Sequence, residues 1–271
     1  MNESLVKYLA GLLDADGNLS FLYTEDSRRE NFFCVGLRLN LGSSSAIDRD
    51  GFVASLPVIT GMGISTSPTN YAGNGKYINW QVSRRGDLEM LLPRLVKHMV
   101  IKAKHWQWML DMWRDIRSRG YGAQSIQATE RLILEQAKKE SRKLQVGPLK
   151  PKNYPSWAWL AGYLDGDGYF MHRKPSAKRY VMQVGACAHI TDASVLEFLQ
   201  KAFGGKIEAH SQSENVMEWE RSLSNTNRSF ALRFLPKVAK HSRLKRHKID
   251  LMIHHHQQRL SALSPTGQAT V

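Results

Sequence analysis

The sequence predicts an α+β protein built from two pseudo-symmetric copies of one αββαββα domain, with an antiparallel sheet in each copy. The main observation is an internal repeat: LAGLLDADG at 9–17 recurs as LAGYLDGDG at 160–168, 151 residues later. Two weaker matches follow in the same order, NWQVS with EWERS (79–83 and 218–222) and KHMVIK with KHSRLK (97–102 and 240–245). A repeat this long indicates two domains rather than a solenoid.

The first copy begins with a helix that ends in the repeated stretch. Asn2 or Ser4 can cap this helix, its leucines recur at helical spacing, and Gly17 ends it. Alternating apolar and polar residues then predict a strand after Gly17 and a second strand over 33–41. The remaining elements expected here are a helix over about 44–56, a hairpin around Gly73 and Gly75, and helices near 86–97 and 102–118.

The second copy repeats this order. We expect strands near 169–174, 179–190, 206–210 and 216–223, a helix from Asp192, and two final helices that reach about residue 260. Between the copies, QATERLILEQAKKESRKLQ predicts a charged helix and VGPLKPKNYPS predicts a proline-broken linker. The expected organisation is an N-terminal domain over 1–120, a linker over 121–155, a C-terminal domain over 156–262 and a tail over 263–271.

The composition favours a nucleic acid as partner. Among 271 residues, 38 Lys and Arg exceed 24 Asp and Glu, which gives a net charge of +14. Such an excess attracts polyanions. No run of about 18 apolar residues and no signal-peptide pattern is present, so we expect a soluble protein without membrane contact or a targeting signal. Cys34 and Cys187 are too few and too far apart for a disulfide framework or a cysteine zinc site.

The repeated stretch predicts a close helix pair. Gly11 and Ala15 lie four residues apart, as do Gly162 and Gly166, so two such helices can approach closely. Their C-terminal ends would then lie side by side and present unpaired carbonyl groups.

Asp16 and Asp167 add two carboxylates at these helix ends. Oxygen ligands in a negative field suit Mg²⁺, which commonly keeps several waters and binds phosphate. The sequence therefore predicts a magnesium site that joins the two copies.

The two nine-residue stretches resemble the signature motifs of the LAGLIDADG homing endonucleases, in the single-chain form with two motifs. The resemblance extends over nearly the whole chain, since motif spacing, element order and charge agree with it. It implies the fold of that family, with two sheets that form a DNA-binding saddle. It also implies an intron-encoded, monomeric, site-specific endonuclease that cuts each strand of a long asymmetric duplex target once.

The resemblance also assigns roles to residues. Asp16 and Asp167 would be the metal ligands, helped by the carbonyl groups of Ala15 and Gly166, whereas Asp14 and Asp165 would be structural. Lys102 and Lys245 match the basic residue that supports the chemistry in this family. Ser43 and Asp192 are the nearest matches to its polar residue at the end of the second strand.

The resemblance further implies which ions and partners to expect. Water would attack the phosphodiester in line, with Mg²⁺ meeting the developing charge, and Mn²⁺ would substitute. Ca²⁺ would support binding without cleavage. The partner would be double-stranded DNA, and the chain's own intron RNA is a second candidate. The compartment would be a bacterial or archaeal cytoplasm or an organelle matrix.

DNA contacts are expected on the solvent-facing side of the strands, where alternation places polar residues at every second position. The candidates in the first copy are Asn18, Ser20, Thr24, Arg38, Asn40, Asn79, Gln81 and Arg84. Those in the second copy are Tyr169, Arg173, Arg179, Gln183, His189, Glu218 and Glu220. The copies differ at nearly every such position, so the target is expected to be asymmetric.

Other interpretations remain open at this point. DADGN resembles the start of a calcium loop, but Leu19 stands where that loop needs glycine. His254–His256 continue a basic helix and are better read as a helix surface than as a zinc site. Trp106, Trp108 and Trp113 have the spacing of core residues. The alternative function is a catalytically silent or dual-function RNA maturase or DNA-binding protein on the same fold.

Overall fold

The structure is a computed structural model of the chain. It describes residues 1–25, 33–44, 51–70, 76–119, 128–141, 155–176, 179–223 and 228–263. The tip of the predicted glycine hairpin, most of the proline-broken linker and most of the predicted tail lie outside these ranges.

The N-terminal half follows the predicted order of elements. Asn2 caps the first helix, because its Oδ1 accepts a hydrogen bond from the backbone N–H of Leu5 at 2.8 Å. The elements are α1 (Glu3–Asp16), β1 (Gly17–Glu25), β2 (Phe33–Ser44), α2 (Phe52–Thr60), β3 (Ile64–Asn70), β4 (Lys76–Val82), α3 (Arg85–Val96), α4 (Ala103–Ser118) and α5 (Ala128–Ser141).

The C-terminal half repeats this order. Ser156 caps its first helix through Oγ, which accepts a hydrogen bond from the N–H of Trp159. The elements are α6 (Trp157–Gly166), β5 (Gly168–Ser176), β6 (Arg179–His189), the 3₁₀ turn η2 (Ile190–Asp192), α7 (Ser194–Phe203), β7 (Lys206–Ala209), β8 (Val216–Ser222), α8 (Arg228–Ala239) and α9 (Arg246–Leu263).

Each half contains one antiparallel sheet of four strands. The strand order is β1-β2-β4-β3 in the first sheet and β5-β6-β8-β7 in the second. Leu41 pairs with both Gly17 and Trp80, and Ala186 pairs with both Gly168 and Trp219. The predicted α+β class with two pseudo-symmetric copies is therefore confirmed, and the structure adds that equivalent residues pair in the same register in both sheets.

One predicted helix is displaced. The sequence pattern predicted a helix over about 44–56, but β2 continues to Ser44 and Gly51 has a positive φ of 65°. Helix α2 begins only at Phe52 and extends to Thr60. The apolar residues after Gly51 carried the helical signal, whereas the left-handed glycine sets the start of the helix.

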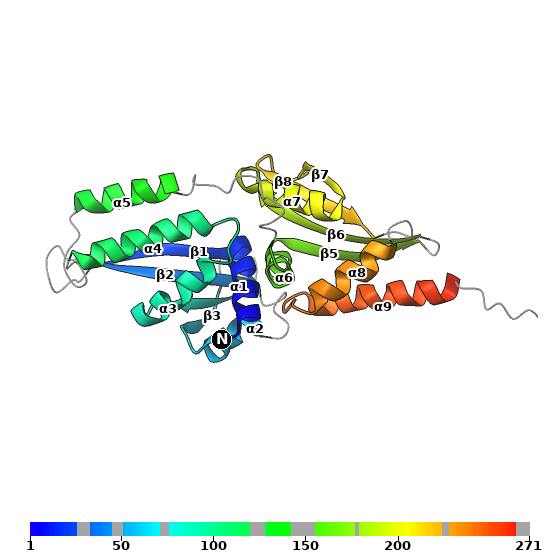
Figure 1. The fold of residues 1–271 in the computed structure, drawn as a ribbon, viewed down its shortest axis with the longest axis horizontal. Coiled ribbons are helices and arrows are strands. Elements are labelled where there is room, and N and C mark those ends of the chain that lie inside the picture. Colours follow the sequence, from blue (N-terminus) through cyan, green and yellow to red (C-terminus); the bar gives the residue numbers. More distant parts are fainter. Residues whose placement is uncertain are drawn as a thin grey trace, which may run out of the picture.

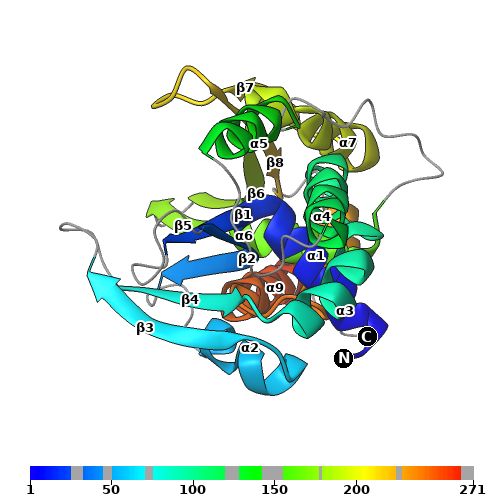
Figure 2. The ribbon, with the colours of Figure 1, turned by 90° about the vertical axis from the view of Figure 1, so that its left-hand side faces the viewer.

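Helices cover one face of each sheet, and none of the described helices lies over the opposite face, which we call the open face (Figure 1 and Figure 2). Figure 2 shows the strands of the first sheet on the left and α1, α3 and α4 on the right. Trp80 of the first sheet and Trp219 of the second are fully buried, and Trp106 and Trp113 of α4 are nearly so. Packing was thus the correct interpretation for all three tryptophans, since the half-buried Trp108 also packs against the core. None of the described helices is long and apolar enough to cross a bilayer.

Helices α1 and α6 form the seam between the halves, side by side in the middle of the molecule (Figure 1). A Cβ built on Gly11 would lie 1.9 Å from the carbonyl oxygen of Trp159, and one on Gly162 would lie 2.0 Å from that of Tyr8. The two backbones therefore touch at the glycines, as the spacing of small residues predicted. Only hydrogen atoms fit between them.

Gly11→Ala and Gly162→Ala should each destabilise the protein by about 3 kcal/mol, because the added methyl group meets backbone that cannot move aside. Thermal unfolding monitored by circular dichroism measures this effect. Gly86→Ala in α3 is the matched control, since a Cβ there meets nothing within 4 Å. Equal melting temperatures for the seam variants and the control would contradict the close contact.

Candidate active site at the helix seam

Asp16 and Asp167 meet where the two seam helices end. Asp16 is the last residue of α1, and Asp167 directly follows the last residue of α6. A Cβ built on Gly166 would lie 2.4 Å from the Cβ of Ala15 and 3.1 Å from Oδ2 of Asp16, so the helix ends are in contact. Asp16 is exposed and Asp167 is half-buried. The structure thus brings the two predicted carboxylates together at the surface.

The surroundings raise the pKa of both carboxyl groups. Desolvation by the packed protein is the largest cause for each. The pKa of Asp167 reaches about 7, because repulsion from Asp16 adds to desolvation, while Lys102 and Lys245 oppose the rise. Two adjacent carboxylates that resist ionisation are suited to a cation, which would relieve both desolvation and repulsion.

Asp14 lies in the interior and has a different role. Its side chain is 2% exposed and accepts hydrogen bonds from the backbone N–H groups of Val100 at 2.6 Å and Lys102 at 2.8 Å. A third comes from Nε1 of Trp159 on the other seam helix, at 2.9 Å. Desolvation raises the pKa of Asp14, and these hydrogen bonds oppose the rise. The same bonds occupy the carboxylate that a calcium loop would have needed.

Asp165 repeats this arrangement in the second half. It accepts hydrogen bonds from five donors: the backbone N–H groups of Arg243, Leu244 and Lys245 and the hydroxyl groups of Ser242 and Tyr8. The Tyr8 bond, at 2.7 Å, crosses the seam. The buried acids of the motif are therefore met by protein donors, and their structural role agrees with what the resemblance implied.

The two cross-seam donors were not singled out from the sequence. Tyr8 and Trp159 occupy the same position in the repeat, three residues before Gly11 and Gly162 respectively. Each carries an aromatic side chain with a polar hydrogen, and each donates to the first aspartate of the opposite motif. Alignment of the two copies could have found this pair.

Lys102 and Lys245 hold the ends of the seam helices. Lys102 directly precedes α4 and Lys245 directly precedes α9. Their ammonium groups make equivalent hydrogen bonds. Lys102 Nζ donates to the carbonyl oxygens of Leu13, Ala15 and Gly17 at 3.1, 2.9 and 2.9 Å. Lys245 Nζ donates to those of Leu164, Gly166 and Gly168. The weak KHMVIK and KHSRLK match therefore marks equivalent lysines.

Both lysines are electrostatically coupled to the acid pair. Desolvation lowers the pKa of Lys102 and of Lys245, and the nearby carboxylates Asp16 and Asp167 raise it. The carbonyl groups of Ala15 and Gly166, expected to assist a metal, already accept hydrogen bonds from these lysines. Each oxygen has a second lone pair, so a shared role is chemically consistent.

Two weaker candidates from the sequence do not form an equivalent pair. Asp192 is half-buried in η2, where desolvation raises its pKa and the nearby Lys102 opposes the rise. By strand register, the equivalent of Ser43 in the second half is residue 188 and not Asp192, because Leu41 and Ala186 are equivalent. The side chain of Ser43 lies outside the described residues. Asp192 alone is thus placed beside the cluster.

The predicted DNA-contact residues of the first half share the open face of its sheet. Asn40 pairs with Asn18 on one side and with Gln81 on the other, and Asn79 pairs with Gly42 in the next row. Ser20 pairs with Arg38 on this face. The side chains of Thr24 and Arg38 lie outside the described residues, and Arg84 is exposed just after β4.

The open face of the second sheet has a different chemistry. Glu220 pairs with Gly185 and Lys206, and Glu218 pairs with Cys187 and Glu208. Tyr169 lies across Gly185, and its hydroxyl donates to Glu220 at 3.2 Å. The remaining candidates are Gln183, which is on this face, His189, which caps η2, and Arg173 and Arg179, whose side chains lie outside the described residues.

The histidine tract does not form a uniform helix surface. His254 is exposed, but His256 is 5% exposed and His255 stacks on His172 of β5 with ring centroids 4.2 Å apart. The tract thus packs partly against the sheet. Within the described ranges, no three His, Cys, Asp or Glu side chains form a metal-binding group. The two-aspartate site needs no such group, because Mg²⁺ takes most of its ligands from water and phosphate.

Asp167→Asn should stabilise the ion-free protein at high pH. The carboxyl has a pKa of about 7 when folded and about 4 when unfolded. Between these values the folded state holds a proton that the unfolded state has lost, so wild-type stability falls as the pH rises through this window. Melting temperatures in chelator at pH about 5 and about 8 test this. The melting temperature of the variant relative to that of the wild type should be higher at the higher pH than at the lower one. An equal difference at both pH values would contradict the raised pKa.

Comparisons with known proteins identify the fold. No protein-family model and no curated protein matches the chain. Among solved structures, the LAGLIDADG homing endonuclease I-GzeII in complex with its DNA target is 14% identical, with a TM-score of 0.70 over 97% of this chain and 93% of that one.

Two further DNA complexes are similar. The meganuclease I-AabMI bound to uncleaved DNA is 16% identical, with a TM-score of 0.69 over 97% and 92% of the two chains. I-SmaMI bound to cleaved DNA is 17% identical, with a TM-score of 0.65 over 98% and 93%. The chain therefore has the two-domain fold of the single-chain LAGLIDADG homing endonucleases.

Proposed function

We propose that this protein is a metal-dependent, site-specific endonuclease that cuts both strands of a long, asymmetric DNA duplex. The observation that carries the proposal is the pairing of Asp16 with Asp167 at the ends of α1 and α6, each half supplying one acid and one lysine. A pair of equivalent groups at one junction suits a reaction performed once on each strand.

The acid pair fits a divalent cation such as Mg²⁺. Asp16 and Asp167 would hold it, and the carbonyl groups of Ala15 and Gly166 provide further oxygen atoms at the same place. When bound, the ion supplies Lewis acidity, which activates water and neutralises charge on a phosphate. The chain's own contribution is to fix both carboxylates on helices whose backbones touch, so that neither acid can withdraw from the other.

Lys102 and Lys245 have two tasks in this proposal. Each ammonium group holds three carbonyl oxygens at a helix end, and each remains coupled to both acids. By binding these carbonyl oxygens, the lysines would partly neutralise the negative C-terminal ends of α1 and α6 while a phosphate approaches. A positive charge next to the acid pair would also attract that phosphate.

Duplex DNA would lie on the open faces of the two sheets, over which no helix of the described ranges lies (Figure 1 and Figure 2). Amide side chains of the first sheet, such as Asn40 and Gln81, suit adenine, and the carboxylates Glu218 and Glu220 of the second suit cytosine. Since the two faces differ, the target would be asymmetric. One chain contains both halves, so it would act as a monomer.

The solved neighbours support this proposal. I-SmaMI has been seen with cleaved DNA, and also with an uncleaved DNA target in the presence of calcium ions. Both observations agree with a duplex substrate and with a site for divalent ions on this fold. They also favour Ca²⁺ as an ion that permits binding without cleavage here.

Asp16→Asn and Asp167→Asn should each abolish double-strand cleavage and leave specific DNA binding nearly unchanged, because the ion and the bases would contact different residues. A target selected from randomised duplexes supplies the substrate, and plasmid cleavage with Mg²⁺, Mn²⁺, Ca²⁺ or chelator supplies the measurement. Asp250→Asn is the control, since this exposed acid on α9 pairs only with Arg246 in the described interactions.

The outcomes separate the candidate functions. Loss of cleavage in both variants, with the control active, supports the proposal. A chain that selects DNA but never cleaves it would be a binding protein on the same fold. Cleavage by either variant would refute the assignment of the acid pair.

Lys102→Ala and Lys245→Ala should lower the single-turnover cleavage rate about 100-fold or more while changing DNA affinity much less. Both side chains lose contacts to buried carbonyl groups, so the rates must be measured well below the melting temperature of each variant. Lys248→Ala, an exposed lysine on α9, is the matched control. A loss confined to affinity would identify the lysines as phosphate anchors without a role in the reaction.

A further inference from the structure

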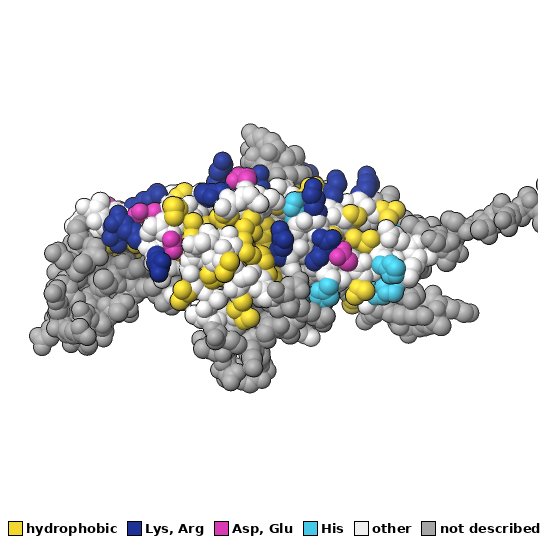
Figure 3. Space-filling view, turned by 90° about the horizontal axis from the view of Figure 1, so that it is seen from below, with side chains coloured by type: hydrophobic (Ala, Val, Ile, Leu, Met, Phe, Trp, Pro, Cys, Tyr) yellow, Lys and Arg dark blue, Asp and Glu magenta, His cyan; other side chains and the backbone are white. Residues whose placement is uncertain are grey.

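The C-terminal half carries an aromatic cleft that the proposed DNA cleavage does not use. Its volume is about 220 Å³, and it is lined by Trp157, Ala202, Phe203, Phe230, Arg233, Phe234 and Lys237. Four of these seven side chains are aromatic, two are cationic and none is acidic. More generally, lysine and arginine side chains are spread over the described surface on the face shown in Figure 3.

The rings form one connected cluster. Phe234 contacts Phe203 edge-on at 5.1 Å between centroids, and it stacks on Phe230 at 4.9 Å. Trp157 contacts Phe203 at 5.6 Å and Phe234 at 5.9 Å. Trp157, Phe203 and Phe230 are each only half-buried. The cleft therefore offers flat aromatic surface that remains accessible to solvent.

Cations border these rings. Nζ of Lys237 lies 5.0 Å from the centroid of Trp157, and the guanidinium of Arg221 lies 4.9 Å from that of Phe230. Lys237 and Arg233 are exposed on successive turns of α8. An aromatic floor with a cationic rim matches a flat, polarizable ring attached to an anion.

The fold itself does not require this cluster, as the other half shows. Offsets of 151 and 143 residues relate α6 to α1 and α8 to α3, so the equivalents of Trp157, Phe230 and Phe234 are Val6, Asp87 and Leu91. Aliphatic and polar residues thus suffice at these positions.

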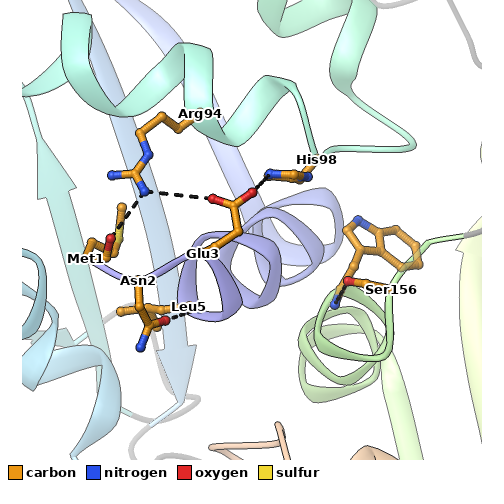
Figure 4. A network of polar contacts seen from close by, with 8 residues as sticks. Met1, Asn2, Glu3, Leu5, Arg94, His98 and Ser156 are labelled. Atoms are coloured by element: carbon orange, nitrogen blue, oxygen red, sulfur yellow. Dashed lines mark hydrogen bonds and ion pairs between the residues drawn. The ribbon is translucent and has the colours of Figure 1, made fainter.

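The equivalent of Lys237 already has an anion. Arg94 donates to the carbonyl oxygen of Met1 at 3.2 Å and lies 3.9 Å from the carboxylate of Glu3, which also contacts His98 (Figure 4). The first half thus places its own carboxylate beside the cation at this position. In the second half, the described residues place aromatic rings there instead.

The cleft is remote from the acid pair. Trp157 is the first residue of α6 and Asp167 follows its last, so the two sites lie at opposite ends of a helix of 10 residues, which spans about 15 Å. The cleft also lies among the helices, on the side away from the open face of the sheet. An occupant would not compete with DNA bound on the strands.

We propose that this cleft binds an unpaired nucleotide, whose base stacks on the aromatic rings while its phosphate contacts Lys237 and Arg233. Stacking of bases on aromatic side chains, with nearby cations for the backbone, is the usual means of binding single strands. The net charge of +14 favours such a ligand. This proposal does not depend on the endonuclease activity.

The test uses the full-length protein and fluorescent single-stranded oligonucleotides, RNA and DNA, with unlabelled duplex DNA in excess to occupy the open faces of the sheets. Anisotropy measures affinity. Lys237→Ala, Arg233→Ala and the charge reversal Lys237→Glu should each weaken single-strand binding at least tenfold without changing duplex affinity. Lys201→Ala is the control, since this exposed lysine neighbours Ala202 but does not line the cleft.

Crosslinking locates the ligand independently of these variants. A strand with a single 5-iodouridine should crosslink to Trp157, Phe203, Phe230 or Phe234 on irradiation, as read by mass spectrometry. Separate arms with UMP and AMP as competitors distinguish a free nucleotide from a strand: displacement at equal concentration identifies a mononucleotide, and its absence identifies a longer strand. Both results support the cleft as a nucleotide site.

The proposal is overturned if the cleft variants bind single strands as the wild type does, or if crosslinks fall only on β-strand residues. These outcomes are independent of Asp16 and Asp167, because a cleavage-inactive protein can still bind a single strand. A failure of the endonuclease proposal would leave this test intact.

Discussion

The direct contact of two helix backbones at Gly11 and Gly162 determines the geometry of this protein. The contact leaves no room for side chains, so the relative position of α1 and α6 is set by backbone atoms that cannot adopt other rotamers. The positions of the side chains at the C-terminal ends of α1 and α6 are therefore also closely defined. Asp16 and Asp167 are brought together because the helices that carry them cannot separate without exposing the buried residues of both cores.

The seam extends its control outward through Asp14 and Asp165. Each buried carboxylate binds the turn that carries the lysine of its own half, and each also receives a donor from the opposite helix. One acid therefore links three parts: its helix, the partner helix and the lysine turn. Burial without these donors would cost several kcal/mol per carboxylate. Each lysine therefore reaches its observed position only when the two halves are correctly paired.

The repeat made most of the fold predictable. Two copies of one pattern fixed the order of elements, and the four-residue spacing of small residues fixed the helix contact. The start of α2 was missed, because the apolar residues after Gly51 gave a helical signal that did not locate the left-handed glycine. In the site, the acid pair followed from the motif alone. The donors Tyr8 and Trp159 did not, since a helical pattern does not reveal which polar hydrogen crosses to a partner helix. The contacts of the lysines with carbonyl groups could not be predicted either, because each joins residues about 80 or more positions apart in the sequence.

The buried lysines give the protein an internal counter-charge. Their ammonium groups satisfy carbonyl oxygens at both helix ends, so the most negative part of the backbone is neutralised by the chain itself. Under the proposed function, folding would therefore not depend on the ion, unlike that of small zinc domains, whose cores form around the metal. If the proposed metal-dependent reaction is correct, a cell could keep this protein folded without activity, and the local supply of divalent cations would determine when the reaction begins.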